Sequence, residues 1–579
     1  MKCAYVDSGG SAFDSAACLG LESPYTRKVQ QMKHVTLRTS VAAAVVAAAV
    51  AGAAGAAEIL VTADISTSTT WTKNNTYNLQ TQIYVLPGAT LTIEAGTVIA
   101  STTNLGGSLA VTRDARIVAL GTADEPIIFT SKADVETWTN GDPKTGTWRA
   151  TCNEWGNLTI CGRGYIGKYG TGAISGNTAA PNAGNVAVME GLTQANAADT
   201  RPLYGGGNDF DYSGVLKYCS FRYGGKVIGL GNELNGISLG GIGRETELDF
   251  VEVMNNVDDG IEIWGGTVDL KHFQVWNIGD DSIDLDHGWR GRGQFGLIVT
   301  GYSRIAASGS GFLDSQFEVD GAAKSDAQPV TTCAFYNVTS IGQNLATGRH
   351  ALKYRDGARV QYNNCIFMDS GAEMVRNDGT DGEATDGQTG YGHNGTLSFA
   401  ACWTTDFNAT STVNPFPTGA EERYRAQSSG KLCQITDTVF FNNTAANAYT
   451  GANAVGVFDA ANNNVQATAS PIVLIQRGAN VTNGSQIVQP VIRLDPRAAG
   501  DAVMSVGTAP ANTFYTPAKY RGAFGANENW AYGWSAASAF GFLVAPPADT
   551  GGCPADLTDD GFVDGNDLGQ LLADWGTCN

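Results

Sequence analysis

The sequence predicts an all-β protein, a right-handed parallel β-helix solenoid that carries a small α-helical calcium-loop module at its C-terminal end. Three observations predict the solenoid. Short segments such as 86–100 (LPGATLTIEAGTVIA) alternate apolar and polar residues, which is the period of a β-strand. The central chain contains an internal repeat of 22 residues. No window of the central chain carries a long apolar stripe at the helical period.

The repeat is most regular where residues 248–263 align with residues 270–285, so that Asp258 falls on Asp280. A period in the low twenties suits one coil of a parallel β-helix, in which apolar side chains stack coil on coil into a continuous core. A propeller blade needs about 40 residues, and a leucine-rich repeat has a different consensus. We therefore assign residues 58–545 to the β-helix.

Composition and charge limit the partners. The chain has 36 Lys and Arg against 56 Asp and Glu, a formal net charge of −20, and 73 glycines in 579 residues. Binding to DNA or RNA needs clustered basic residues, so nucleic-acid partners are excluded. Hydrophobic residues make up 43% of the chain, which excludes wholesale disorder.

Residues 1–57 read as an upstream extension followed by a signal peptide. A short basic stretch from Met32 to Arg38 precedes an Ala- and Val-rich run at 41–50, and small residues precede Glu58. This order is typical of a secretory leader cleaved after Ala56 or Ala57. The alternative, a transmembrane helix, is short and weakly apolar at 17 residues (41–57). We expect an exported protein, extracellular or attached to the cell surface, with no membrane span after cleavage.

The cysteines have two expected roles. Those in Cys-x-Phe copies of the repeat fall in the inward stacking column, where we expect small apolar core residues: Cys219, Cys333 and Cys365. Export permits disulfides, and two pairs are close enough in sequence to close a loop: Cys152 with Cys161, and Cys402 with Cys433. The sequence alone does not set the pairing.

Residues 546–552 form a short linker, and residues 553–579 contain a twelve-residue acidic loop. Its spacing is that of a calcium loop, with oxygen ligands at alternate positions and Gly561 at the sharp bend. An apolar stripe after the loop, from Leu568 to Trp575, predicts a helix. The expected Ca²⁺ ligands are Asp556, Thr558, Asp560, the carbonyl of Phe562, Asp564 and Asp567.

This loop and helix resemble one dockerin repeat. The resemblance implies a calcium-binding tag that anchors or sorts the protein through a cohesin-like partner. Two positions depart from the pattern: Thr558 stands where Asp or Asn is usual, and Asp567 replaces a bidentate Glu. Dockerins usually carry two repeats and this chain shows one, which weakens the cohesin inference. An acidic surface turn is the alternative interpretation.

The repeat also places polar residues on the outside of neighbouring strands. If Ile261 and Ile263 point inward, Glu262 and Trp264 point outward. One coil later Asp284 stands beside Glu262, and Asp286 beside Trp264, about 4.8 Å apart along the ladder. Two such carboxylates repel unless one is protonated or a cation lies between them. We expect substrate-binding side chains on this face: Glu262, Trp264, Trp276, Asp286, Trp289 and Arg290.

The opening segments 88–100 and 107–131 resemble secreted bacterial right-handed β-helix proteins of the pectin-lyase-like type. Within the repeat, Asn256-Val-Asp258 and Gly279-Asp-Asp281 are similar to two motifs of polygalacturonases, which implies catalytic acids at Asp258, Asp280 and Asp281; Asp284 is a further candidate. The family's Gly-His-Gly and Arg-Ile-Lys motifs are not found at suitable coils. His350, Lys353 and Arg355 are placed in a different setting. Structural turn chemistry is the competing explanation for the paired acids.

Three functions stay open. The first is a non-catalytic surface or matrix protein whose extended face binds a polysaccharide or a cell-surface component. The second is an enzyme that degrades acidic polysaccharide, either a polygalacturonase-like hydrolase or a Ca²⁺-dependent lyase. A lyase would need Ca²⁺ on Glu262 and Asp284 and a basic group, Arg290 or Lys353, to remove a proton. The third is a rigid spacer whose only chemistry is the calcium tag. The missing His and Lys motifs favour binding, whereas the stacked acids keep catalysis open.

Overall fold

The computed structural model describes the chain from Ala57 onward, with several gaps. The predicted signal peptide lies outside the described residues, and so does the calcium loop with all six of its expected ligands. The described residues are 57–168, 183–229, 232–301, 314–322, 328–345, 350–377, 398–408, 424–444, 457, 460–483, 486–547 and 568.

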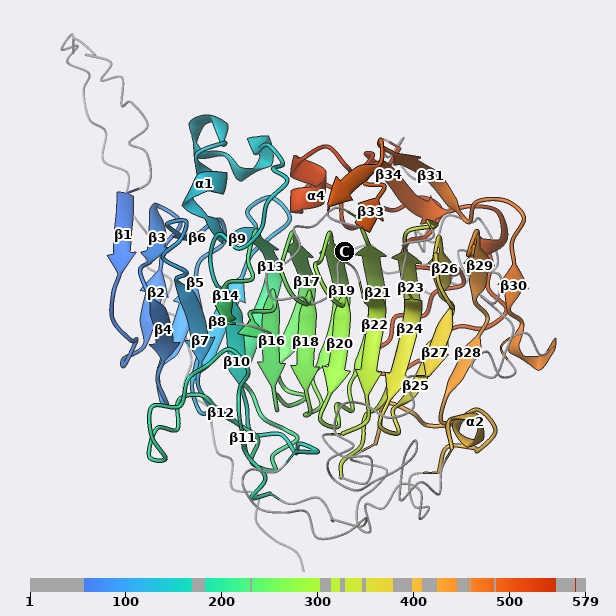
Figure 1. Cartoon of the computed structure of the whole chain (residues 1–579), viewed down its shortest axis with the longest axis horizontal. Coiled ribbons are helices and arrows are strands. Elements are labelled where there is room, and N and C mark those ends of the chain that lie inside the picture. Colours follow the sequence, from blue (N-terminus) through green and yellow to red (C-terminus); the bar gives the residue numbers. More distant parts are fainter. Residues whose placement is uncertain are drawn as a thin grey trace, which may run out of the picture. The chain divides into compact units, whose positions relative to one another are not determined.

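The chain folds as a parallel β-helix, as the sequence predicts (Figure 1). One wall is a nine-stranded sheet in which every neighbouring pair is parallel and each strand comes from a successive coil. Its strands are β4 (Gln82–Val85), β7 (Ser108–Val111), β10 (Leu158–Cys161), β16 (Ile237–Gly240), β18 (Ile261–Trp264), β20 (Ile283–Asp286), β22 (Ser315–Asp320), β24 (His350–Arg355) and β27 (Val375–Asn377).

The other walls form a seventeen-stranded sheet. Early coils contribute two short strands each: β1 (Ala57–Val61), β2 (Thr69–Trp71), β3 (Asn75–Leu79), β5 (Thr90–Ile93), β6 (Val98–Ser101), β8 (Arg116–Leu120) and β9 (Ile127–Ser131). Middle coils join both into one bent strand: β13 (Gly214–Arg222), β17 (Glu247–Met254), β19 (Asp269–Trp276), β21 (Arg292–Val299) and β23 (Thr332–Ile341). Late coils divide again: β25 (Arg359–Asn363), β26 (Ile366–Met368), β28 (Gln434–Thr436), β29 (Val439–Phe441) and β30 (Val465–Gln466).

Each bent strand turns at one residue with positive φ, and these residues stack on the outside. Phe250 (φ 54°) and His272 (φ 44°) are non-glycine residues in the left-handed region. The Phe250 ring lies 4.2 Å from the rings of both Tyr218 and His272, and Phe295 continues the stack at 5.0 Å from His272. Glycine is the usual residue at a turn with positive φ. Here the contacts between stacked rings stabilise the turn with larger side chains.

The interior confirms the 22-residue offset between β17 and β19 and the stacking column expected for Cys219. Cys219 stacks on Val251, and Val251 stacks on Phe273, each buried in one continuous apolar core. Cys333 differs from the expectation, since it lies in register with Val360, in a column on the other side of the bend. Both columns are buried, so the expected role as apolar core residues suits each position.

The coils end at β30, which is earlier than the boundary at 545 expected from the sequence. The following segment forms antiparallel pairs, β31 (Ile472–Arg477) with β34 (Val491–Ala498) and β32 (Val481–Asn483) with β33 (Gln486–Val488), then helix α4 (Ala536–Ala539). It packs on the outer face of the helix and buries Met254, Trp276 and Leu297 in a second apolar core (Figure 1). The apolar outer face of these coils explains why the chain turns back instead of adding coils.

Shorter elements decorate the coils. They are α1 (Lys132–Val135), η1 (Thr139–Gly141), η2 (Pro143–Thr145), β11 (Ala187–Val188), β12 (Leu203–Tyr204), β14 (Val227–Gly229), β15 (Asn232–Glu233), α2 (Phe399–Cys402), η5 (Ala460–Asn462) and η6 (Gly500–Ala502). Within the described ranges, no helix combines the length and hydropathy that a membrane crossing needs.

Candidate functional site

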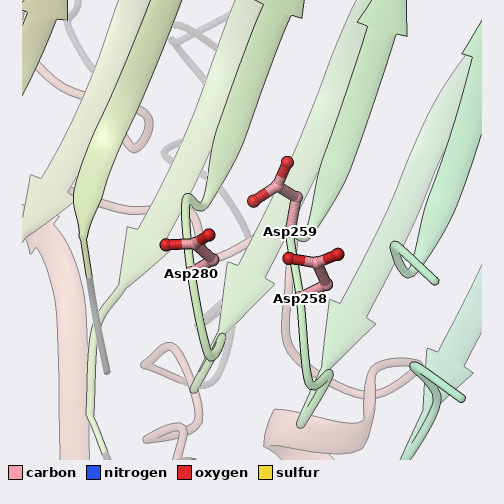
Figure 2. A group of neighbouring side chains, drawn as sticks. All are labelled: Asp258, Asp259 and Asp280. Carbon is pink, nitrogen blue, oxygen red and sulfur yellow. The ribbon is translucent and has the colours of Figure 1, made fainter. Parts of the chain in front are cut away.

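The paired acids lie on two neighbouring turns that enter the nine-stranded sheet. Asp258 and Asp259 stand on the turn between β17 and β18, and Asp280 stands on the equivalent turn between β19 and β20 (Figure 2). Carboxylate oxygens of these three residues lie within 4.8 Å of one another. Repetition of the Asp-Asp pair in consecutive coils therefore creates a cluster of charge as well as a pair of turns.

The register of β18 and β20 is the one expected from the sequence. Glu262 lies beside Asp284, and Trp264 lies beside Asp286. Carboxylate oxygens of Asp259, Glu262 and Asp284 form a second group within 4.8 Å, and those of Asp280, Asp281 and Asp314 form a third. We call the seven residues of these groups the acidic cluster: Asp258, Asp259, Glu262, Asp280, Asp281, Asp284 and Asp314.

Burial and mutual repulsion hold protons on the acidic cluster. Burial raises the pKa of Asp259, Glu262 and Asp284 well above the usual range, and neighbouring carboxylates raise it further. The pKa of Asp280 shifts in the same direction for the same two reasons, burial first and Asp281 next. Burial and the adjoining Asp314 raise the pKa of Asp281 to about 7. With a pKa of about 7, Asp281 exchanges its proton close to neutral pH, and its neighbours favour the protonated form more than an ordinary carboxyl does.

Turn chemistry explains one of these acids and leaves others unexplained. Asp259 Oδ1 accepts a hydrogen bond of 2.9 Å from the backbone N–H of Asp281, as expected of a turn residue. Glu262 accepts a hydrogen bond from the side-chain amide of Asn235. In contrast, Asp284 Oδ1 is buried and accepts no hydrogen bond from the described part of the chain. A buried carboxylate oxygen without a donor is unfavourable unless a proton, a cation or a ligand occupies the site.

Two basic residues that the sequence analysis set apart adjoin the acidic cluster. Lys353 and Arg355 lie on β24, and the ladder from β20 through β22 places Lys353 in line with Glu318 and Asp284. Lys353 Nζ lies 2.8 Å from Asp314 Oδ2 and also contacts Glu318. The charge of Lys353 lowers the pKa of Asp280, Asp281 and Asp284, against the larger effect of burial. The expectation of a different setting was wrong.

The sequence offers Lys353 as a candidate base, but the interrupted repeat prevents it from placing Lys353 beside the acids. Segments inserted between the later coils increase their spacing, so the constant offset of 22 residues fails after β20. The inward pairs Phe317–Val319 and Leu352–Tyr354 repeat the pattern of Ile283 and Leu285. The coils can be aligned by these apolar pairs instead of by a constant spacing. That alignment places Lys353 beside the acids.

The tryptophans do not form the expected open platforms. Trp289 is 0% exposed in the inner core, where its indole N–H donates to the Val268 carbonyl. Trp276, 1% exposed, packs against Phe542 under the C-terminal segment. Trp264 is buried beside Tyr204 of β12. Sequence periodicity cannot show which outward side chains a distant segment will cover.

Arg290 also differs from its expected role in sugar binding. It is 0% exposed and forms two hydrogen bonds to Asp209, of 2.7 and 2.9 Å, so its charge is already balanced inside the protein. Asp286 is partly exposed and lies 2.8 Å from His287 Nε2, while Tyr204 Oη contacts the other ring nitrogen at 2.7 Å. Burial opposes the ionisation of Asp286, but the adjacent His287 holds its pKa below the usual range.

With this geometry in view, comparison with known proteins identifies the family. Residues 63–454 match the family model of the pectate-lyase-like beta helix domain. The chain belongs to this family. The match spans the coils and the acidic cluster and stops before the C-terminal segment that covers the outer face. No curated protein and no solved structure matches the chain. Membership of this family agrees with the parallel β-helix. It does not identify a reaction, so the chemistry has to follow from the residues of the acidic cluster.

Proposed function

We propose that the acidic cluster of this pectate-lyase-like β-helix protein binds and cleaves a polysaccharide. The observation that carries the proposal is the grouping of carboxyls from consecutive coils, with oxygens within 4.8 Å of one another and pKa values raised by burial. Cleavage of a glycosidic bond needs a protonated carboxyl for the leaving oxygen and an ionised one to activate water or attack the sugar. Carboxyls whose environments separate their proton affinities supply both.

The partly exposed members of the cluster take the contact roles. Asp258, Asp280 and Asp284 keep some solvent access, whereas Asp281 is buried behind them. We assign proton donation and water activation to Asp280 and Asp284, with Asp258 contacting the sugar. Asp281 is a positioning residue, because it raises the pKa of both Asp280 and Asp284. Lys353 moderates the total negative charge.

A divalent cation favours a second form of the same proposal. Three overlapping groups of carboxylates have their oxygens within 4.8 Å, and Asp284 Oδ1 accepts no hydrogen bond from the described residues. Ca²⁺ prefers clustered carboxylate oxygens and would replace the protons held there. The charge of the bound ion would then decide the substrate. Without the cation the cluster repels an anionic chain and suits a neutral polysaccharide, and with it a uronate chain can bridge to the protein.

The decisive experiment measures cleavage of neutral and uronate polysaccharides by residues 58–579, each with Ca²⁺ and with a chelator. Reducing ends without unsaturated products, unaffected by the chelator, support acid–base hydrolysis. Unsaturated products that require Ca²⁺ support the cation-dependent form. Retention of a polysaccharide without products would return the protein to a non-catalytic binding role, and neither cleavage nor retention would leave the rigid spacer.

Export and the C-terminal calcium tag belong to the same proposal. The signal-peptide pattern supports a secreted or surface-attached protein, and the spacing of the acidic loop supports a Ca²⁺-dependent anchor for a cohesin-like or sorting partner. If the tag is the sole calcium site, deleting residues 551–579 abolishes the effect of Ca²⁺ on the melting temperature. A calcium effect that survives the deletion identifies the acidic cluster as a second site.

A further inference from the structure

Two cysteines far apart in sequence meet where the last strands of the nine-stranded sheet end. Cys402 is the final residue of α2, and Cys433 directly precedes β28. The backbone N–H of Cys433 donates to the Cys402 carbonyl at 2.9 Å, and the nearby Cys402 thiol raises the pKa of Cys433, after the larger effect of burial. Both side chains are completely buried.

A short antiparallel backbone ladder holds this pair in place. Leu432 N–H donates to the Thr405 carbonyl at 3.0 Å, and Phe407 N–H donates to the Gly430 carbonyl at 2.7 Å. An antiparallel bridge joins Asp406 to Lys431 between them. These two hydrogen bonds, together with the one between the cysteines themselves, fix the backbone on both sides. They therefore fix the direction in which both cysteine side chains leave the chain.

The remaining cysteines provide a contrast. Cys152 packs beside Val257, whereas Cys161 packs with Met189 and Tyr204 in a different apolar cluster, so their closeness in sequence does not bring them together. Cys333 and Cys219 each stack on apolar neighbours of other coils. Among the cysteines in the described part of the chain, Cys402 and Cys433 are the pair that a backbone hydrogen bond joins directly.

We propose that Cys402 and Cys433 are oxidised to a disulfide when the protein folds in an oxidising compartment. A disulfide needs Cα atoms about 4.4–6.8 Å apart. A backbone hydrogen bond between the two cysteines keeps their Cα atoms within about 5–6 Å, by standard bond lengths. The present structure holds both residues as thiols. The proposal is independent of the polysaccharide site.

The chemistry is a two-electron exchange. Two thiols lose two protons and two electrons and form one Sγ–Sγ bond, and a disulfide reagent such as oxidised glutathione accepts them and becomes two thiols. One cysteine thiolate first attacks the reagent and releases one thiol, and the second cysteine then displaces the other. Burial raises the pKa of Cys433, so the exchange precedes closure of the core.

The bond would fasten a segment that packs behind the acidic cluster. Phe399 and Trp403, on either side of Cys402 in this segment, lie 5.6 and 6.0 Å from Tyr354. Tyr354 neighbours Lys353 on β24, the lysine that contacts Asp314 and Glu318. A disulfide across the 30 residues between positions 402 and 433 restricts the unfolded chain and holds this segment against β24.

Peptide mapping tests the proposal directly. Residues 58–579 are produced with an export leader, collected from an oxidising compartment, alkylated in denaturant without reductant and digested. We expect one linked species containing Cys402 and Cys433, lighter than the reduced pair by about 2 Da per bond and separated by reduction. Alkylation of both residues before reduction would overturn the proposal, and so would a link from either residue to another cysteine.

Two variants supply the matched control. Cys402→Ser removes the bond, so reductant should no longer lower the melting temperature through this pair. Cys219→Ser changes an equally buried cysteine of the stacking column and should keep the linked peptide. An unchanged response to reductant in Cys402→Ser contradicts the proposal. If either variant fails to fold, the map of the unsubstituted protein decides the question alone.

Discussion

Buried carboxylates in two regions of this β-helix have opposite surroundings. Under the C-terminal segment, Glu252 of β17 accepts hydrogen bonds from Ser220 (2.5 Å), Gln274 (3.2 Å) and the backbone N–H groups of Ala536 (2.6 Å) and Ala537 (3.0 Å). At the acidic cluster, Asp284 Oδ1 is buried and accepts no hydrogen bond from the described residues.

The difference separates a structural carboxylate from a functional one. Donors from two coils and from α4 satisfy both oxygens of Glu252, and the contact fastens the C-terminal segment to β17. Like charges surround the acidic cluster instead, and its oxygens face one another. Burial raises the pKa at both places, so burial alone does not distinguish them. The two places differ in how many hydrogen-bond donors surround the carboxylate. A buried carboxylate without donors can instead bind a proton, a cation or a substrate hydroxyl.

The largest expected effect is on catalysis at the incomplete site. Asp284→Asn keeps the shape of the side chain and removes its proton chemistry, so we expect cleavage to fall by about 10²- to 10⁴-fold. The melting temperature should stay the same or rise, because one repelling charge is lost. Turnover on the best polysaccharide and thermal unfolding measure the two effects. Glu247→Gln, an exposed acid of β17, is the control and should keep full activity. Full activity in Asp284→Asn removes this residue from the mechanism.

The next effect is on stability at the satisfied site. Glu252→Ala leaves four hydrogen-bond donors without an acceptor under α4 and should lower the free energy of unfolding by about 3–5 kcal/mol. Urea unfolding measures it. Glu252→Gln keeps one acceptor oxygen and should lose less. If both variants match the unsubstituted protein, the bonds to Ala536 and Ala537 contribute nothing to holding the C-terminal segment.

A third prediction concerns the pH dependence of stability. It uses Asp281, an acid of the acidic cluster that titrates near neutral pH. The pKa of Asp281 is about 7 in the folded protein, whereas an unfolded Asp ionises near about 4. The folded state therefore binds this proton more tightly, and its contribution to stability is full below pH 4 and lost as the pH rises through 7. Asp281→Asn should be progressively more stable than the unsubstituted protein as the pH rises from 4 to 8.

Melting temperatures across this pH range provide the measurement, read as the difference between variant and unsubstituted protein. Addition of Ca²⁺ at pH 8 should reduce that difference if the cluster takes up the cation. A difference that does not change with pH would mean that Asp281 is ionised throughout and that its neighbours hold the protons.

Periodicity explains what the sequence could predict. The offset of 22 residues correctly placed Glu262 beside Asp284 and Asp258 near Asp280, because stacking in a β-helix depends on local alternation and on the repeat. The same argument failed wherever a segment remote in sequence covers a coil. Trp276 has the pattern of an outward residue, yet Phe542, more than 260 positions later, buries it.

The position of Lys353 beside the acidic cluster could not be predicted, for a related reason. Inserted segments between β20 and β24 change the spacing of the later coils but preserve the inward apolar pairs that set their register. The ion pair between Arg290 and Asp209 could not be predicted from the sequence either, because Asp209 belongs to a different coil. Contacts within the repeat are readable from the sequence, whereas contacts made by insertions and returning segments need the folded chain.

The smallest expected effect tests whether Lys353 acts on the cluster or only on its direct partners. Lys353 lowers the pKa of Asp281 and Asp284, so Lys353→Met should raise both. The stability advantage of Asp281→Asn levels off near the folded pKa of Asp281. When both proteins also carry Lys353→Met, that pH should rise by about one unit or less. Lys353→Arg keeps the charge and is the matched control. An unmoved curve would mean that Asp314 and Glu318 neutralise Lys353 completely and that the acidic cluster balances its own charge by holding protons.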